Sequence, residues 1–326
     1  ALPRPVGHAT TLTNEAVASY HQRRMDSRTF LGLEATHNRF RWKLPVTKKI
    51  SVSAGFLFGG CGLAAAISAL EGTSGRQCVW ATSQYLSYAN PGEVVDIDVT
   101  IAVEGHAITQ ARAVCHVADR EILTVNAALG DRNILERGQW ESLPGGLPSP
   151  MSLPSRPVAA ESVGTITEKL DQRMVKGVEW EELALDVADA DQGDGQTLMW
   201  ARIPDVIADV DATTLAILGD FVPMGVGQAL GRRGGGNSLD NTLRVGRTVP
   251  TDWVLMDIRV HSVERGFGHG LVHMFAEEGT QAIGGPGGQL LATASHSVIA
   301  RFWEDRPTER IAEKIVEAGG EVKLEG

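Results

Sequence analysis

Two stretches of the chain show the same succession of elements, an apolar segment followed by four runs in which apolar and polar residues alternate. In the first half, a helix is predicted at 60–71 and strands at 77–88, 93–104, 106–117 and 120–129. In the second half, the helix is predicted near 211–222 and the strands near 238–247, 252–263, 266–276 and 289–303. Alternating runs rich in Val, Ile and Thr are typical of half-buried strands. Short turns between such strands favour an antiparallel sheet.

The two halves also align with one another in sequence. The segment YLSYANPGEVVDIDV (85–99) aligns with TLRVGRTVPTDWVLMDIRV (242–260), so that Asp96-Ile97 corresponds to Asp257-Ile258. A repeat of this length indicates a duplicated domain. Between the halves, 142–157 holds five of the fourteen prolines and is predicted to be a linker. We therefore expect an N-terminal repeat at 1–141, the linker, a C-terminal repeat at 158–305, and a C-terminal helix and tail at 306–326.

The first predicted helix is built mainly of Gly, Ala and Ser, so a sheet can curl closely around it. A long antiparallel sheet wrapped around one central helix is the hot-dog fold, and the sequence predicts an α+β protein with two such repeats in tandem. The run 50–70 has no charge, but four glycines and three serines dilute it. We interpret it as a strand at Val52–Phe58 and the start of the helix, and we expect no membrane span.

Composition narrows the class of protein further. The chain has 326 residues and a net charge of −10, which disfavours a nucleic-acid partner. Its three cysteines are too few for a disulfide framework, so a reducing compartment, the cytoplasm, is expected. No clustered ligands suggest a metal ion, and no motif calls for a cofactor. The glycines of 225–236 predict a loop.

Four segments resemble the type-II acyl-CoA thioesterase family over about 30–305: GFLFGG (55–60), LAILGDF (215–221), SLDNTLRV (238–245) and LLATASHSVIARF (290–302). The resemblance implies a double hot-dog hydrolase of fatty acid metabolism that converts acyl-CoA to a carboxylic acid and CoA, and a homo-oligomer. It further implies an aspartate, a serine or threonine and a glutamine that hold the attacking water. By motif, these positions are Asp220, Ser238 and His296, so the glutamine is replaced.

The residues themselves suit this chemistry. Asp220 lies in an apolar helical segment, where burial would raise the pKa of its carboxyl group toward a range useful for a base. His296 lies on an apolar strand face, from which imidazole could pair with a carboxylate or donate to a water. We expect the histidine either to make hydrolysis more dependent on pH below about 6.5 or to mark a chain that has lost hydrolysis.

Other residues are candidates for substrate binding. The backbone N–H groups of Gly59 and Gly60 open a helix, where an anion or oxyanion could bind. Asp240 is expected on the same face of the strand as Ser238, because side chains two residues apart in a strand point the same way. Arg232 and Arg233, between Asp220 and Ser238, are candidates for the phosphates of CoA.

Two alternatives remain open. The missing glutamine is compatible with a non-catalytic protein that binds acyl-CoA or an acyl carrier on the same scaffold. The second alternative is a hot-dog enoyl-CoA hydratase. The chain, however, lacks the aspartate and histidine of the hydratase signature within a G-D-x-N-P motif.

Overall fold

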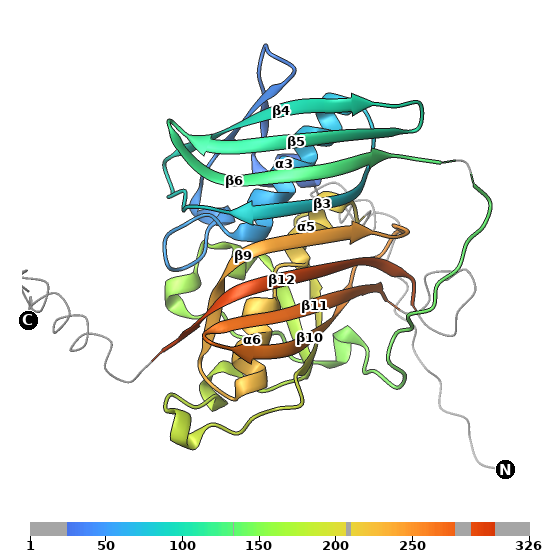
Figure 1. The fold of residues 1–326 in the computed structure, drawn as a ribbon. Helices are drawn as coiled ribbons and strands as arrows, with labels where there is room; N and C mark the ends of the chain where they lie inside the picture. The colour runs from blue at the N-terminus through green and yellow to red at the C-terminus, as the bar shows by residue number, and fades with distance from the viewer. Residues whose placement is uncertain (1–24, 133, 207–209, 278–287, 304–326) are drawn as a thin grey trace, which may run out of the picture.

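The computed structural model describes residues 25–132, 134–206, 210–277 and 288–303. The predicted C-terminal helix of 306–326 lies outside these residues. Twelve strands form one sheet in the order β1-β2-β4-β5-β6-β3-β9-β12-β11-β10-β8-β7, with every neighbouring pair antiparallel. The predicted class, a long antiparallel sheet with central helices, is confirmed (Figure 1).

The strands of the first half are β1 (Glu34–Ala35), β2 (Arg41–Pro45), β3 (Cys78–Tyr85), β4 (Val94–Glu104), β5 (Ile108–Val117) and β6 (Arg120–Gly130). Those of the second half are β7 (Asp171–Lys176), β8 (Gln196–Arg202), β9 (Gly234–Val245), β10 (Val254–Glu264), β11 (Phe267–Ala276) and β12 (Leu290–Phe302). The two halves join where β3 pairs with β9, at the middle of the sheet (Figure 1).

The eight predicted strands correspond to β3–β6 and β9–β12, and four further strands were missed. Of these, β8 is buried over its whole central part and therefore shows no alternation. The strand predicted at Val52–Phe58 is wrong, because only Leu57 of this segment makes an isolated bridge, to Ser51. The rest of the segment turns tightly, with Gly55 in the left-handed region at φ 84°.

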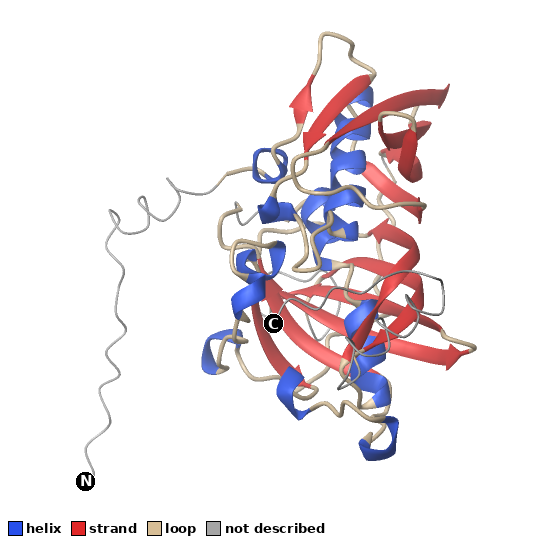
Figure 2. Cartoon of the chain, turned by 90° about the vertical axis from the view of Figure 1, so that its left-hand side faces the viewer, coloured by secondary structure: helices blue, strands red, loops and turns tan. Residues whose placement is uncertain are grey.

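The helices lie against one face of the sheet (Figure 2). They are α2 (Ser27–Leu31), α3 (Gly59–Ser74), α4 (Ile166–Lys169), α5 (Ala212–Leu218) and α6 (Val222–Leu230). Short 3-10 turns occur at Lys48–Ile50, Pro150–Ser152, Ala160–Ser162, Trp180–Glu182 and Val187–Asp189. Helix α3 is buried from Gly60 to Leu70, as its small residues predict. Within the described residues, no helix is long and apolar enough to cross a membrane.

The second central helix is divided in two. The predicted helix near 211–222 corresponds to α5, and Gly219, Asp220 and Phe221 separate it from α6. The loop predicted from the glycines of 225–236 is wrong, because this segment forms α6 and the start of β9. Gly225 is required for packing instead: a Cβ atom there would lie 2.7 Å from Ile258 Cγ2 of β10.

The segment 142–157 packs on the second half of the sheet. Leu143 is buried in a second apolar cluster together with Trp200, Trp253, Leu255 and Phe275. Trp200 Nε1 donates to the carbonyl oxygen of Pro148 at 3.1 Å. The proline-rich segment is therefore held against the sheet by both apolar and polar contacts.

Candidate active site

Asp220 lies in the break between α5 and α6, and its side chain is buried. Its Oδ2 accepts a hydrogen bond from the backbone N–H of Gly60 at 2.6 Å. Ser238 Oγ on β9 donates to Oδ1 at 3.3 Å. Burial raises the pKa of Asp220 to about 7, although these two hydrogen bonds favour the ionised form. A carboxyl group with this pKa can act as a general base near neutral pH.

His296 faces Asp220 from β12. Its Nδ1 lies 3.4 Å from Asp220 Oδ1, and its Nε2 is 2.9 Å from the carbonyl oxygen of Gly219. That carbonyl lacks its usual helical donor, because Pro223, four residues later, has no backbone N–H. The imidazole therefore carries its proton on Nε2 and presents Nδ1 to Asp220 as an acceptor.

The environment of His296 also changes the expected pH dependence. Burial lowers the pKa of His296 to about 4, so the imidazole is neutral over most of the working range. The sequence led us to expect a titration of this histidine near 6.5. The group with a pKa near neutrality is Asp220 instead.

The structure thus brings Asp220, Ser238 and His296 together, with Gly60 of the first half beside them. Gly60 allows this approach, because a Cβ atom there would lie 2.9 Å from the carbonyl oxygen of Ala216 and 3.0 Å from Asp220 Cβ. The sequence led us to expect that the N–H of Gly60 is open to an anion. In the structure this N–H is instead bonded to Asp220. The carbonyl oxygen of Gly59 accepts from the hydroxyl of Tyr85 at 3.0 Å.

Asp240 does not share the face of Ser238. Ser238 pairs with the buried Val298, whereas Asp240 pairs with Ser297, and the register shifts between these two pairs. Asp240 Oδ1 accepts from the backbone N–H of Ser297 at 2.8 Å. A bulge of this kind reverses the alternation, so the next inward residue on β9 is Asn241.

Arg232 and Arg233 are bonded to the 3-10 turn Trp180–Glu182 and to the segment that follows it. Arg232 Nη2 donates to the carbonyl oxygen of Leu185 at 3.1 Å, and its guanidinium stacks on Phe302 at 4.5 Å. Arg233 donates to the carbonyl oxygens of Leu183 and Glu181 at 3.0 and 2.6 Å. Binding to CoA phosphates would have to compete with these contacts, so the phosphate role stays a prediction.

These contacts lead to a test of Arg233. Replacement by Ala is expected to lower the free energy of unfolding by about 1–2 kcal/mol, because two carbonyl oxygens lose their donor. KM for an acyl-CoA is expected to stay unchanged. Thermal unfolding and steady-state kinetics of the same preparation measure both. A raised KM with unchanged stability would instead restore the phosphate role.

Asn241 was missed by the sequence analysis. It is 1 % exposed and pairs with Ser83 of β3 and His296 of β12, so it lies directly beside the site. The sequence pattern did not indicate this residue, because the alternation of side chains along the strand, counted from Ser238, selects Asp240 as the next inward residue. Only the bulge makes Asn241 the inward residue.

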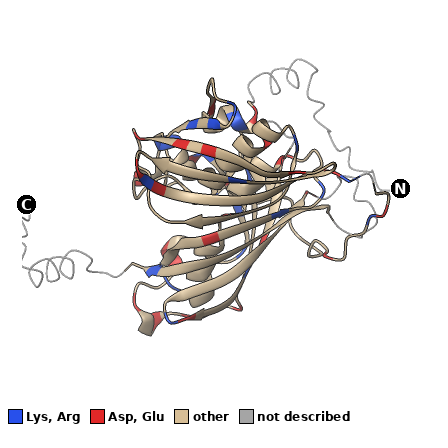
Figure 3. Ribbon diagram, turned by 45° about the horizontal axis from the view of Figure 1, so that its top comes forward, with Lys and Arg blue, Asp and Glu red and all other residues tan. Residues whose placement is uncertain are grey.

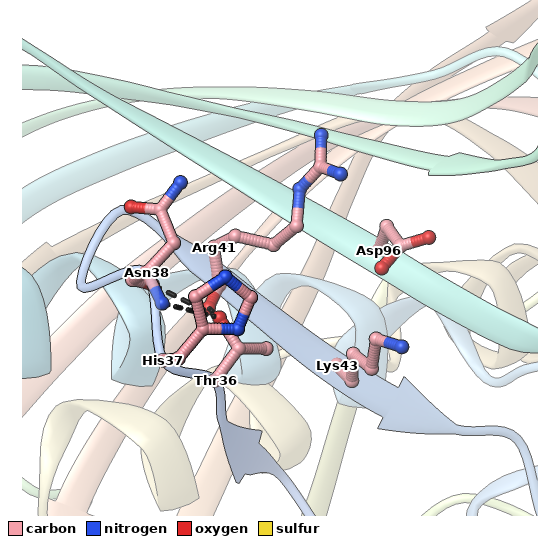
Figure 4. Close-up of a pocket in the computed structure, with 6 residues that line it drawn as sticks. All are labelled: Thr36, His37, Asn38, Arg41, Lys43 and Asp96. Atoms are coloured by element: carbon pink, nitrogen blue, oxygen red, sulfur yellow. Dashed lines mark hydrogen bonds between the residues drawn. The ribbon is translucent and has the colours of Figure 1, made fainter.

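Two hollows of the described surface lie away from these residues. One, of about 440 Å³, is formed at the β1–β2 hairpin by polar residues of β2, β4 and their connections (Figure 4): Thr36, His37, Asn38, Arg41, Lys43 and Asp96. Arg41 there is paired with Asp98 at 2.6 Å. Another, of about 850 Å³, is lined by 131–132 and 134–141 and by residues at the ends of β9 and β12, with as many acidic as basic residues. Neither contains a predicted site residue.

Charged residues of both signs lie side by side on the upper strands in Figure 3. The pairs Arg41–Asp98 and His116–Asp98 join β2, β4 and β5 there, at 2.6 and 3.0 Å. Within the described ranges, no group of three or more His, Cys, Asp or Glu side chains could hold a metal ion.

Known proteins that resemble this chain bear on the chemistry of the site around Asp220. Residues 150–299, which include Asp220, Ser238 and His296, match the family model of the acyl-CoA thioesterase C-terminal domain. A comparison with curated protein sequences finds no match. Among solved structures, a proposed thioesterase from Novosphingobium aromaticivorans is 27 % identical, with a TM-score of 0.69 over 82 % of this chain and 97 % of its own.

Two further structures show the same fold at lower identity. A hot-dog protein of unknown function from Alicyclobacillus acidocaldarius is 18 % identical, with a TM-score of 0.68 over 84 % of this chain and 97 % of its own. An acyl-CoA thioesterase II from Mycobacterium marinum is 19 % identical, with a TM-score of 0.62 over 85 % of this chain and 98 % of its own. The resemblance read from the sequence is confirmed by the match of residues 150–299 to the acyl-CoA thioesterase C-terminal domain.

Proposed function

We propose that this protein hydrolyses acyl-CoA thioesters to a carboxylic acid and CoA, with Asp220 as the general base. The observation that carries the proposal is the buried contact of Asp220 with Ser238, His296 and Gly60. The family match of residues 150–299 supports the same class of reaction. The buried carboxyl group, with a pKa of about 7, supplies a proton acceptor at neutral pH.

The reaction follows from these groups. Asp220 accepts a proton from a water molecule while the water oxygen bonds to the thioester carbon, and the carbonyl electron pair moves onto oxygen. When the tetrahedral intermediate collapses, the carbon–sulfur bond breaks and the protonated Asp220 gives its proton to sulfur. The products are the carboxylic acid and the free thiol of CoA, and Asp220 is ionised again.

Ser238 and His296 hold the participants of this step in place. Ser238 donates to Asp220 Oδ1 and so favours the ionised, basic form of the carboxyl group. His296 Nδ1, an acceptor without a hydrogen-bond partner among the described residues, can accept the second hydrogen of the attacking water. The neutral histidine then performs a positioning role for which no positive charge is required.

Release of free thiol from a panel of acyl-CoAs of increasing chain length tests the proposal. We expect release from at least one chain length, with the optimum defining the acyl specificity. Saturable binding of acyl-CoA with no release from any member of the panel would favour the non-catalytic alternative. Hydration of an enoyl-CoA without thiol release would favour the hydratase.

The pH dependence of hydrolysis gives a separate prediction. Because Asp220 must be ionised to accept a proton, kcat/KM is expected to rise with pH and to level off above its pKa of about 7. Below this value the rate should fall about tenfold per pH unit. Initial rates between pH 5 and 9 in buffers of constant ionic strength measure the profile. A midpoint near 4 would argue that an ordinary exposed carboxylate is the base.

A further inference from the structure

We infer that Asn241 is a catalytic residue whose side-chain amide donates a hydrogen bond to the thioester carbonyl oxygen as that oxygen becomes negatively charged. The inference rests on the proposed function and adds the group that stabilises its intermediate. Asn241 lies on β9, in the centre of the sheet.

Asn241 occupies the strand that joins the two halves. Its neighbours in register are Ser83 on β3 and His296 on β12, both of which are buried. Side chains of directly paired residues on one face lie about 5 Å apart. Since His296 Nδ1 is 3.4 Å from Asp220 Oδ1, the amide of Asn241 lies next to the reacting groups.

The amide itself is left without a well-formed hydrogen bond. Asn241 is 1 % exposed, and neither its Oδ1 nor its Nδ2 makes a hydrogen bond of good geometry among the described residues. The hydroxyl of Tyr85 lies near the amide but donates to the carbonyl oxygen of Gly59. Buried polar groups are nearly always hydrogen-bonded, and an unsatisfied one costs about 1–3 kcal/mol. A cost of this kind is expected where a substrate group completes the hydrogen bonding.

The other donors described at the site are already engaged. The N–H of Gly60 and the hydroxyl of Ser238 donate to Asp220. Nε2 of His296 is bonded to Gly219, and the hydroxyl of Tyr85 to Gly59. The two N–H bonds of the Asn241 amide are thus the side-chain donors still available to an oxyanion.

The amide is not needed to hold the strands together. Ser83 Oγ donates to the main-chain carbonyl oxygen of Asn241 at 3.2 Å, so this contact survives any change of the side chain. Replacing a buried, unbonded polar side chain by an apolar one of similar shape is neutral or stabilising. Stability and activity should therefore respond in opposite directions.

The experiment compares Asn241→Leu and Asn241→Asp with the unmodified protein. Loss of one oxyanion donor typically lowers kcat by about 10²–10³-fold, and this loss is expected in both variants. The melting temperature of Asn241→Leu should be equal or higher. The Asp variant keeps the shape of Asn241 but places a carboxyl group near Asp220, so the midpoint of its pH profile should move upward.

Thr109→Val is the matched control. Thr109 is 1 % exposed, its Oγ1 is also buried without a partner, and it lies on β5, three strands away from β9. This variant should keep its kcat. Unchanged kcat in both Asn241 variants would overturn the inference, as would an equal loss in Thr109→Val. If the unmodified protein releases no thiol, the proposed function itself fails, so the two failures are distinguishable.

Discussion

Asp220→Asn is expected to reduce kcat for thiol release by about 10²–10⁴-fold, because the amide cannot accept the proton of the attacking water. The shape of the side chain and an acceptor for the N–H of Gly60 are retained, so the fold should persist. KM should change little, since the carboxylate acts in the chemical step rather than in ground-state binding. Stopped assays with limiting enzyme measure the residual rate.

Stability supplies the check that the variant is folded, and its sign follows from the raised pKa. In the folded protein Asp220 has a pKa of about 7 rather than 3.8, so the folded state holds its proton over a range in which the unfolded chain has released it. The stabilisation from this proton is lost as pH rises from about 4 through about 7, and no more is lost at higher pH. Asp220→Asn lacks this loss, so the excess of its melting temperature over that of the unmodified protein should grow from pH 4 to about 7 and then level off.

Asp257→Asn is the control for this comparison. Asp257 is 1 % exposed and belongs to the same half, but it is bonded to Gln196 and Arg259 on β8 and β10. Its replacement should lower stability, because the buried carboxylate loses its ionic contact with the half-exposed guanidinium of Arg259, and should leave kcat unchanged. If Asp220→Asn retains full activity while folded, the carboxyl group of Asp220 is not the base.

Gly60→Ala is expected to have the second large effect. The added Cβ atom would lie 2.8 Å from Phe58 Cε1, 2.9 Å from the carbonyl oxygen of Ala216 and 3.0 Å from Asp220 Cβ. Because a backbone carbonyl cannot move away as a flexible side chain can, α3 has to shift from the break between α5 and α6. Overpacking of this kind costs about 1–3 kcal/mol, measurable by denaturant unfolding.

The same change should also alter the pH profile. The N–H of Gly60 favours the ionised form of Asp220, so moving it away raises the pKa of that carboxyl group and the midpoint of kcat/KM. Gly145→Ala, with no atom within 4 Å of the added Cβ, is the control and should change neither property. An unshifted midpoint in Gly60→Ala would show that the hydrogen bond does not set the basicity of Asp220.

Much of the fold could be predicted because its pattern is local. The small residues of α3 and the alternation in β3–β6 and β9–β12 are visible in single segments of sequence. β8 could not be found in this way, since both of its faces are covered and its central residues are uniformly buried. Pairing of β3 with β9 depends on contacts between residues about 160 positions apart, which no local period encodes.

The same contrast between local patterns and contacts of distant residues applies to the candidate site. Asp220, Ser238 and His296 were found through short motifs, and the structure brings them together. Asn241 was missed and Asp240 was placed on the wrong face, because a single bulge on β9 changes which residues point inward. The positive charge of Arg232 and Arg233 was evident, but their carbonyl partners lie about 50 residues earlier in the chain.

The hydrogen bond from Gly60 to Asp220 has a consequence for how the site is assembled. It joins the start of the helix in the first half to the acidic residue of the second half, 160 positions away. Neither half alone contains both residues, so two copies of the same half would not form this contact. Because both halves belong to one polypeptide, they always meet in a one-to-one ratio.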